Sequence, residues 1–534
     1  MEPNRFSPEL HPNLPCLSWC ARVRNGESTI LLRHGEAVEA DESRFCEGAW
    51  SADFAKHDFG GALFFSGSGG YLTTEGVEFA TATHTLGQLF LMRLRDETLV
   101  SNSLIFVLSQ AGDDLDRKYK FYAHDMMSVM DGIRKYVQGI PTRDGNRVEQ
   151  FYFCNISIDR SGRVARKEKP LPPAFRDYAE YVNFLQAQVV AVAANARDPA
   201  RKHRYEPMTT ISSGYDSTTA SAFAKAVGCK QAITFTMSRG HGADSGREVA
   251  ERLGLEVLEF DREEYRKHDD SEVEFLATGN GGEDMVMAPL AELFAGKLVF
   301  TGFYGLIWDR INPDMGPDLL KSDASGCSME EFRLRVGFIH FPVPYIGCRR
   351  HPDIYRISGS DELKPWRSGD DSYDKPIPRR FLQELGIPGN LFGQKKRGAT
   401  QPFITVCRDD PPPEEVLTAE SLRDFNEFVK GVPFFNRPGE RAFLFLMRQL
   451  SRFNRFLLRA CRQIGFCERG GLLVPMKYRK KISEAHLIFP WAVSKIMERY
   501  RLPAREEAEQ VRERMGSIKA VEAAEHFGRA NSPG

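Results

Sequence analysis

Short apolar runs alternate with helical patterns between residues 208 and 302, and this alternation constrains the fold more than any other feature of the sequence. Apolar runs of strand length are separated by segments with helical spacing of their apolar residues. Such alternation is typical of a parallel sheet whose crossover helices cover its faces. We therefore predict an α/β region with helices on both faces of a parallel sheet. Its expected strands lie at 208–211, 232–236, 255–260 and 297–302, and its expected helices at 216–227, 245–253 and 285–294.

The residues before this region have a different pattern. Short β-like runs separated by turn residues predict a β-rich α+β first domain, with strands at 28–32, 61–65, 89–94 and 150–156. Because glycine adopts positive φ without strain, the glycine-rich string 67–70 predicts a hairpin turn.

Two proline-rich stretches mark the expected domain boundaries. A charged stretch at 167–173 precedes a helical pattern at 175–196, and three consecutive prolines stand at 411–413. We expect a β-rich domain over 1–170, an α/β domain over 171–410 and a mostly helical C-terminal extension over 411–534.

Composition excludes several classes of protein. The 534 residues are 42% hydrophobic and 27% charged, as in folded globular proteins. The net charge of −1 offers no global attraction to nucleic acid or to an anionic membrane. No apolar run approaches the roughly 18 residues that cross a bilayer, and the first residues lack a signal-peptide pattern. Ten scattered cysteines without a CxxC pair indicate reduced thiols, so we expect a cytoplasmic protein that does not bind a membrane.

The string 208–218 has the arrangement of a phosphate-binding loop. A β-like run ends in small residues and passes into a helical pattern that opens at Asp216. The N–H groups and the dipole of a helix N-terminus attract an anion. Ser212, Ser213 and Ser217 add hydroxyl groups, and the Asp216 carboxylate could hold Mg²⁺. The string therefore suits a nucleoside triphosphate, and a simple N-capped helix is the alternative.

Neither a Walker A motif nor GxGxxG occurs here, but the string resembles a third nucleotide loop. It is similar to the SGGxDS pyrophosphate loop of ATP pyrophosphatases, the family of asparagine synthetases and β-lactam synthetases, with Ser213 in place of the first glycine. The runs 232–237, 243–254 and 298–305 resemble the family's next strand, its following helix and the strand before its second loop. The resemblance implies an adenine nucleotide alpha hydrolase-like fold. It also implies that ATP contacts Ser212, Ser213, Gly214, Tyr215, Asp216, Ser217, Thr236, Met237 and Gly302.

One departure from the family concerns the metal. The second loop of the synthetases carries an Asp-Glu pair that helps to bind magnesium or to position the substrate, where this chain has Leu306 and Ile307. Either Asp309 or Asp284 takes over that role, or the substrate differs; we assign Asp309 as a metal ligand beside Asp216. A surface acid at a helix start is the alternative for Asp309.

A late segment, 374–398, resembles the part of the synthetases that contains their catalytic lysine. It places Lys395 on that lysine, with Lys396 as the competing register. A fixed ammonium there would stabilise the negative charge that develops when an adenylate is attacked. A solvated basic turn is the alternative.

The first domain resembles a glutaminase domain that lacks its nucleophile. In glutamine-dependent family members a cysteine directly follows the initiator methionine, whereas residue 2 is Glu2 in this chain. Residues 85–104 are weakly similar to the paired strands of that domain. The resemblance implies a retained but inactive domain, and Cys16 and Cys20 are interpreted as ordinary thiols.

Together the resemblances imply an ATP-dependent, AMP-forming carbon-nitrogen ligase with bound Mg²⁺. Its substrates would be a small carboxylate and an amine or ammonia. Assembly into a homo-oligomer is possible. One alternative is a relative that adenylates a nucleic acid, and another is a non-catalytic nucleotide-binding descendant, motivated by Ser213 and the missing acids. A nucleic-acid substrate is supported by a row of arginines at helical spacing, Arg448, Arg452, Arg455, Arg459 and Arg462. The near-neutral net charge of the chain counts against a nucleic-acid substrate.

Overall fold

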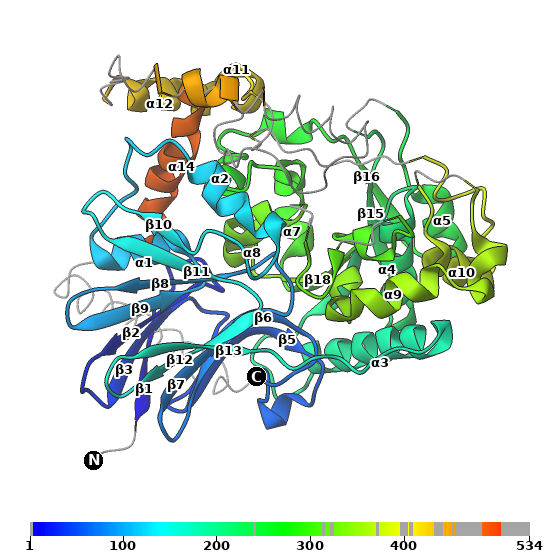
Figure 1. Cartoon of the computed structure of the whole chain (residues 1–534), viewed down its shortest axis with the longest axis horizontal. Coiled ribbons are helices and arrows are strands. Elements are labelled where there is room, and N and C mark those ends of the chain that lie inside the picture. The colour runs from blue at the N-terminus through cyan, green and yellow to red at the C-terminus, as the bar shows by residue number, and fades with distance from the viewer. Residues whose placement is uncertain are drawn as a thin grey trace, which may run out of the picture.

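A computed structural model describes residues 4–238, 242–311, 315–320, 325–369, 373–395, 404, 409–431, 442–443, 445–450, 453 and 483–502. Residues 5–168 form two β-sheets that pack face to face (Figure 1). The first has seven strands in the order β1-β3-β2-β9-β8-β11-β10, and only its β1–β3 pair is parallel. The second has six antiparallel strands in the order β13-β12-β7-β6-β5-β4. The strands are β1 Arg5–Leu10, β2 Trp19–Arg24, β3 Thr29–His34, β4 Glu39–Ala40, β5 Arg44–Trp50, β6 Phe65–Leu72, β7 Gly76–Ala80, β8 Leu89–Arg93, β9 Glu97–Ser101, β10 Gly139–Pro141, β11 Arg147–Phe151, β12 Cys154–Asp159 and β13 Val164–Glu168.

An aromatic core holds these two sheets together. The Trp19 ring, from the first sheet, lies edge-on to Phe45 of the second at 4.7 Å between centroids, and it stacks on Phe79 at 5.9 Å. All three side chains are buried. Aromatic residues bury large apolar areas, and the β-rich first region predicted from the sequence is confirmed.

The predicted hairpin turn at residues 67–70 is wrong, since these glycines lie inside β6. Gly67 pairs with Gly48 of β5, and Gly70 pairs with Phe45. A Cβ atom at Gly67 would overlap the backbone carbonyl of Glu47, and one at Gly70 would overlap the Phe45 ring. The glycines therefore serve a close approach of two strands rather than a turn.

Two other expected strands of the first region also differ from the structure. The run 61–65 is not a strand, because β6 begins only at Phe65. The run 150–156 is split between β11 and β12, and Phe153 between them has a φ of +54°. A left-handed residue breaks the extended backbone, and an apolar pattern alone does not reveal it. The runs 28–32 and 89–94 are confirmed as β3 and β8.

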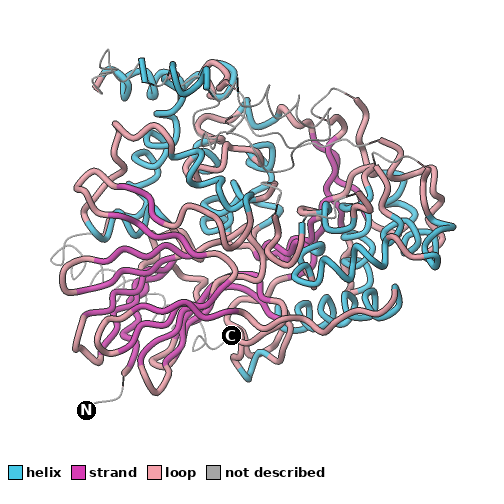
Figure 2. Tube along the Cα trace, in the orientation of Figure 1, coloured by secondary structure: helices cyan, strands magenta, loops and turns pink. Residues whose placement is uncertain are grey.

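The predicted parallel sheet is confirmed, with five strands in the order β16-β15-β14-β17-β18 (Figure 2). The strand β18, which is short and follows a helix, was not predicted from the sequence. The strands are β14 Glu206–Thr210, β15 Gln231–Phe235, β16 Glu256–Phe260, β17 Lys297–Thr301 and β18 Ile339–Pro342.

Each face of this sheet is covered by its own apolar core. Leu298 and Phe300 of β17 are buried in one core together with Phe223 of α4. Val299, between them, is buried in the other core together with Phe294 of α7. Strand residues point alternately to the two faces, so helices cover both sides. The α-helices of the chain are α1 Leu104–Ala111, α2 Tyr122–Met126, α3 Tyr178–Ala196, α4 Tyr215–Ala226, α5 Arg247–Arg252, α6 Val273–Leu276, α7 Ala291–Phe294, α8 Glu330–Val336, α9 His351–Ser358, α10 Pro376–Glu384, α11 Pro413–Val416, α12 Ala419–Lys430 and α14 Ile488–Ile496.

Helix ends follow local chemistry. The Asp177 side chain accepts a hydrogen bond from the Glu180 N–H and caps α3. The expected helix at 285–294 is a 3₁₀ segment, Met285–Leu290, followed by the short α7, because Pro289 interrupts the α-helical hydrogen bonds. None of the helices among the described residues is long and apolar enough to cross a membrane.

Of the five arginines at helical spacing, Arg448 pairs with Asp409 at 2.8 Å. The other four arginines lie outside the described residues.

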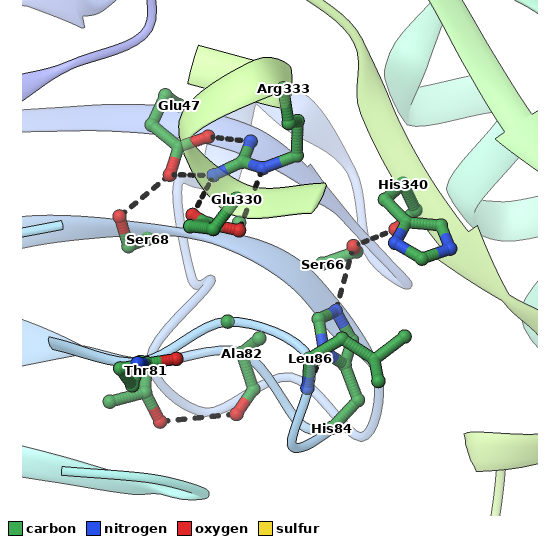
Figure 3. Close-up of a pocket in the computed structure, with 13 residues that line it drawn as sticks. Glu47, Ser66, Ser68, Thr81, Ala82, His84, Leu86, Glu330, Arg333 and His340 are labelled. Atoms are coloured by element: carbon green, nitrogen blue, oxygen red, sulfur yellow. Dashed lines mark hydrogen bonds and ion pairs between the residues drawn. The ribbon is translucent and has the colours of Figure 1, made fainter. Parts of the chain in front are cut away.

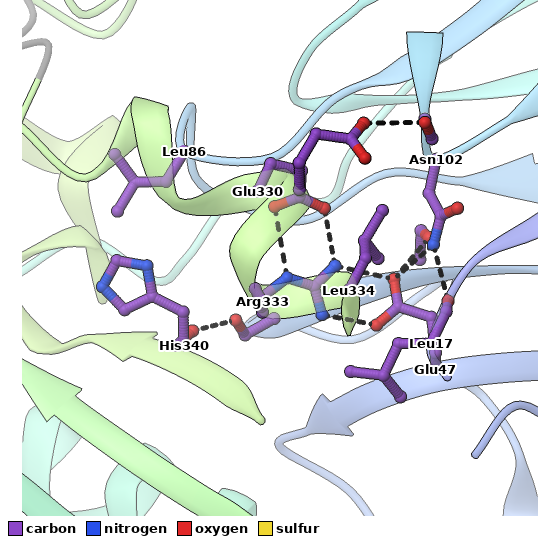
Figure 4. Close-up of polar contacts among 12 residues, drawn as sticks. Leu17, Glu47, Leu86, Asn102, Glu330, Arg333, Leu334 and His340 are labelled. Atoms are coloured by element: carbon purple, nitrogen blue, oxygen red, sulfur yellow. Dashed lines mark hydrogen bonds and ion pairs between the residues drawn. The ribbon is translucent and has the colours of Figure 1, made fainter. Parts of the chain in front are cut away.

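A buried ion cluster joins the first region to the α/β region (Figure 4). Arg333 of α8 makes a two-pronged contact with Glu47 of β5, at 2.7 and 3.1 Å, and reaches Glu330 at 2.6 Å. The Arg333 and Glu47 side chains are 6% and 0% exposed. A planar guanidinium can hydrogen-bond to two carboxylates at once. Removing Arg333 would leave the Glu47 and Glu330 carboxylates without this cation.

We expect Arg333→Met to lower the free energy of unfolding by about 3–5 kcal/mol, the usual cost of breaking a buried ion pair. Urea denaturation followed by tryptophan fluorescence measures this change. As a matched control, Arg247→Met removes an exposed pair with Glu259 and should cost less than about 1 kcal/mol. Equal costs for the two variants would contradict a role of the buried cluster in stability.

Candidate active site

The strand order of the parallel sheet switches direction between β14 and β17. From β14 the chain continues to β15 and β16 on one side, and from β17 to β18 on the other. Open parallel sheets bind ligands where the strand order reverses in this way. The loops that follow Thr210 and Thr301 lie at this point, and the predicted phosphate loop is one of them.

The loop after β14 is held by its own hydroxyl groups. The Ser212 N–H donates to Ser217 Oγ at 3.0 Å, and the two hydroxyls lie 2.8 Å apart. The Gly214 N–H donates to Ser212 Oγ at 3.2 Å. Gly214 is the N-cap of α4 and, as a glycine, has no side chain to cap the helix, while the Tyr215 N–H donates to the Tyr373 hydroxyl at 3.4 Å. The N-terminus of this 12-residue helix therefore meets a loop that is already folded.

Ser213, which stands where the family has glycine, uses its side chain to fix the loop. Its hydroxyl donates to Asp244 Oδ1 at 2.6 Å, and its N–H donates to the Asp244 carbonyl at 3.2 Å. From the opposite direction, the Gly393 N–H donates to the Ser213 carbonyl at 2.8 Å. The loop therefore joins three segments that the sequence analysis connected only by resemblance.

Two glycines after β17 allow their loop to lie directly against the start of α4. A Cβ atom at Gly302 would overlap the backbone N of Ser217, and one at Gly305 would overlap the Asp216 carboxylate. Gly302 was predicted to line the site, whereas Gly305 was not selected. Glycine at these positions permits the close approach of the two loops.

The centre of the site is a lysine that was not among the predicted site residues. The Lys375 ammonium, just before α10, lies 2.8 and 2.7 Å from the two carboxylate oxygens of Asp216. It also lies 2.8 Å from the Gly305 carbonyl and 3.1 Å from Asp309 Oδ1. The two predicted metal ligands, Asp216 and Asp309, are thus brought together around one ammonium. A second pair, Arg310 with Asp374 at 2.9 Å, lies beside this cluster.

Charge and burial favour the ion cluster over a resident metal ion. Burial disfavours the charged form of Lys375, yet the Asp216 and Asp309 carboxylates outweigh it and raise the lysine pKa above its usual value. A metal ion held by both carboxylates would stand at contact distance from the ammonium and be repelled by it. The described residues contain no cluster of three or more His, Cys, Asp or Glu side chains able to hold a metal ion. Asp216 and Asp309 therefore do not fit a resident Mg²⁺ while Lys375 is in place, and Mg²⁺ as a companion of ATP stays a prediction.

The other predicted site residues differ in position. Thr236 and Met237 directly follow β15, with Thr236 exposed and Met237 half-buried. The Tyr215 ring is buried against Tyr373 and beneath the Arg379 guanidinium, so it packs the loop. Lys395 is exposed, two residues beyond the Gly393 that binds the loop. Lys396, the alternative to Lys395, lies outside the described residues. Asp284, the alternative to Asp309, is buried and accepts a hydrogen bond from the Ser328 hydroxyl at 2.7 Å.

A small cavity of about 10 Å³ lies between the first region and the elements α8 and β18, with room for about one water molecule (Figure 3). On its wall, Ser66 Oγ lies 2.9 Å from His84 Nε2 and donates to the backbone carbonyl of His340. His340 Nε2 in turn lies 2.8 Å from the hydroxyl of Thr301. A continuous polar chain therefore runs from the first region to the residue before Gly302.

The thiols of the first region are not activated. Burial raises the pKa of Cys16 to about 11 and that of Cys20 to about 12. A reactive cysteine needs a lowered pKa, so this observation agrees with the interpretation of both as ordinary thiols.

No known family model and no curated protein matches the sequence. The resemblance to the synthetases therefore stays a hypothesis that depends on the residues themselves.

We expect acid to destabilise the contacts of His340 with Ser66 and Thr301, which link the first region to β17. Burial, and then the charge of Arg333, lower the His340 pKa to about 3, whereas an unfolded histidine titrates near 6.5. The contribution of neutral His340 to stability is therefore complete above about pH 6.5 and is lost as the pH falls from 6.5 through 3. The free energy of unfolding of His340→Gln, from urea denaturation, should fall less steeply between about pH 6 and pH 4 than that of the wild type. One histidine contributes a limiting slope of roughly 1.4 kcal/mol per pH unit. The exposed His268→Gln serves as control, and identical slopes for His340→Gln and the wild type would contradict the assignment.

Proposed function

We propose that this protein is an ATP-dependent ligase that adenylates a carboxylate and transfers the acyl group to an amine. The observation that carries the proposal is the position of the 212–217 loop. It leads into the N-terminus of α4, whose N-cap is Gly214, at the strand-order switch of a five-stranded parallel sheet. The strand order and the switch point are those of doubly wound nucleotide-binding sheets. An adenine nucleotide alpha hydrolase-like fold and a cytoplasmic location belong to the same proposal.

The chain's own residues supply binding and charge. ATP, when bound, supplies an electrophilic α-phosphorus and a pyrophosphate leaving group. The N–H groups at the start of α4 would bind the phosphates, and Thr236 and Met237, at the end of β15, would border the base. Lys375 keeps Asp216 in place and limits the negative charge that the phosphates meet. The exposed Lys395 would approach the acyl group and stabilise negative charge as the amine attacks.

A non-catalytic nucleotide-binding protein is the second candidate, and one observation favours it. The loop N–H groups of Ser212 and Ser213 donate to other groups of the chain, namely Ser217 Oγ and the Asp244 carbonyl. Phosphate binding at these two groups would have to replace those hydrogen bonds. Nucleotide binding without pyrophosphate release would support this second candidate.

Pyrophosphate release tests the proposal. The full chain is incubated with ATP and Mg²⁺ across a panel of amino acids and small carboxylates, beside an Asp216→Ala variant. We expect release that depends on one carboxylate and disappears in the variant, because Asp216 anchors the start of α4 to Lys375. Silence across the panel with ATP still bound would contradict adenylation of a small carboxylate. Release that requires RNA, and that weakens steeply with salt, would instead favour the nucleic-acid alternative.

We expect Lys395→Ala to slow product formation by roughly 10² to 10³, the scale of losing one preorganised charge partner. Single-turnover rates separate this loss from a change in ATP binding. Lys364→Ala removes another exposed lysine and should leave the rate unchanged. An unaltered single-turnover rate in Lys395→Ala would remove Lys395 from the chemistry.

A further inference from the structure

We propose that the ammonium of Lys375 is a tethered cation that occupies the place a divalent metal ion would take between Asp216 and Asp309. Four oxygen atoms surround it: two from Asp216, one from Asp309 and the Gly305 carbonyl, at 2.7 to 3.1 Å. Carboxylate and carbonyl oxygens are also the ligands that hard divalent cations prefer. The chain has therefore built an oxygen-lined cation site and filled it with its own side chain.

Burial makes this cation hard to exchange. The Lys375 side chain is 4% exposed and Asp309 is 8% exposed, while Asp216 is 26% exposed. Removing the ammonium would leave two carboxylates close together in a poorly solvated place, which is costly. Gly305 brings the Asp216 carboxylate this close to the β17 loop, since any side chain there would displace it. The lysine is thus required by the same packing that brings the β17 loop against the start of α4.

The consequence for the metal is specific. Two carboxylates and one ammonium carry a net charge of −1, which offers a divalent ion little attraction, and the ammonium repels it at short range. We infer that the protein alone binds no divalent ion at this position. Any Mg²⁺ in the reaction enters with the nucleotide phosphates; this last step rests on the proposed function, whereas the tethered cation does not.

Replacing Lys375 should therefore create a metal site. Lys375→Met keeps the length of the side chain and removes the charge, leaving Asp216, Asp309 and the Gly305 carbonyl as ligands. Mn²⁺ is titrated into the full chain without nucleotide and followed by electron paramagnetic resonance. We expect Lys375→Met to bind about one Mn²⁺ at least roughly 10²-fold more tightly than the wild type, because repulsion between an ammonium and a divalent ion at contact distance is of that size even in water.

Two further variants make the test specific. Lys375→Met combined with Asp309→Asn should lose the new Mn²⁺ site, and the exposed Lys364→Met should bind Mn²⁺ as weakly as the wild type. Failure of a folded Lys375→Met to gain Mn²⁺ affinity would overturn the proposal.

The wild type provides a test that does not depend on the folding of a variant. Tight, stoichiometric Mn²⁺ binding by the wild type that disappears in Asp309→Asn would overturn the proposal, because the place would then belong to the metal. Acylation of Lys375 by an amine-reactive ester, measured by mass spectrometry, should be at least about tenfold slower than that of exposed Lys364, and equal rates would also overturn it. These measurements use no ATP, so a failure of adenylation leaves their outcome unchanged.

Discussion

One buried ammonium connects the parts of the chain that form the candidate site. Lys375 contacts Asp216 at the start of α4, and Gly305 and Asp309 in the loop after β17. These groups come from three separate stretches of sequence that meet at the carboxyl ends of β14 and β17 in the parallel sheet. A charge in such a place is stable only when opposite charges surround it, so the position of each stretch depends on the other two. The phosphate loop, the β17 loop and the start of α10 are therefore one electrostatic unit.

The first region is connected to this unit rather than simply attached to it. The cluster of Arg333, Glu47 and Glu330 joins β5 to α8, and it lies next to the small cavity that Ser66 and His84 border. His340 extends the polar contacts to Thr301, the last residue of β17. Because buried polar groups must keep their hydrogen bonds, a change in the first region that moves Ser66 would be felt at the residue before Gly302.

Periodicity predicted the α/β region well and the β-rich region less well. All four strands expected between 208 and 302 are present within two residues of their predicted ends, because a buried parallel strand bounded by polar turns has a strong local pattern. The glycines at 67–70 misled the prediction: local preference allows a turn, and only the neighbouring β5 explains why they are in a strand. The 285–294 run was expected to be one helix, although Pro289 was visible in the sequence and marks its interruption.

The candidate site, too, combines local features that the sequence predicted with contacts that only the tertiary structure shows. The small residues at 212–217 and the helix that follows are local features, so the sequence by itself determined the loop, the helix start and Asp216 as its acid. The sequence also contains the complementary dipeptides Asp309-Arg310 and Asp374-Lys375, but nothing local says that they meet. Their pairing was decided by the tertiary structure, because the order of the strands brings the β17 loop to α4, and Lys375, at the start of α10, reaches both. Burial there turned an ordinary lysine into the central cation of the site, since a low dielectric strengthens its attraction to two carboxylates that sequence separation keeps far apart.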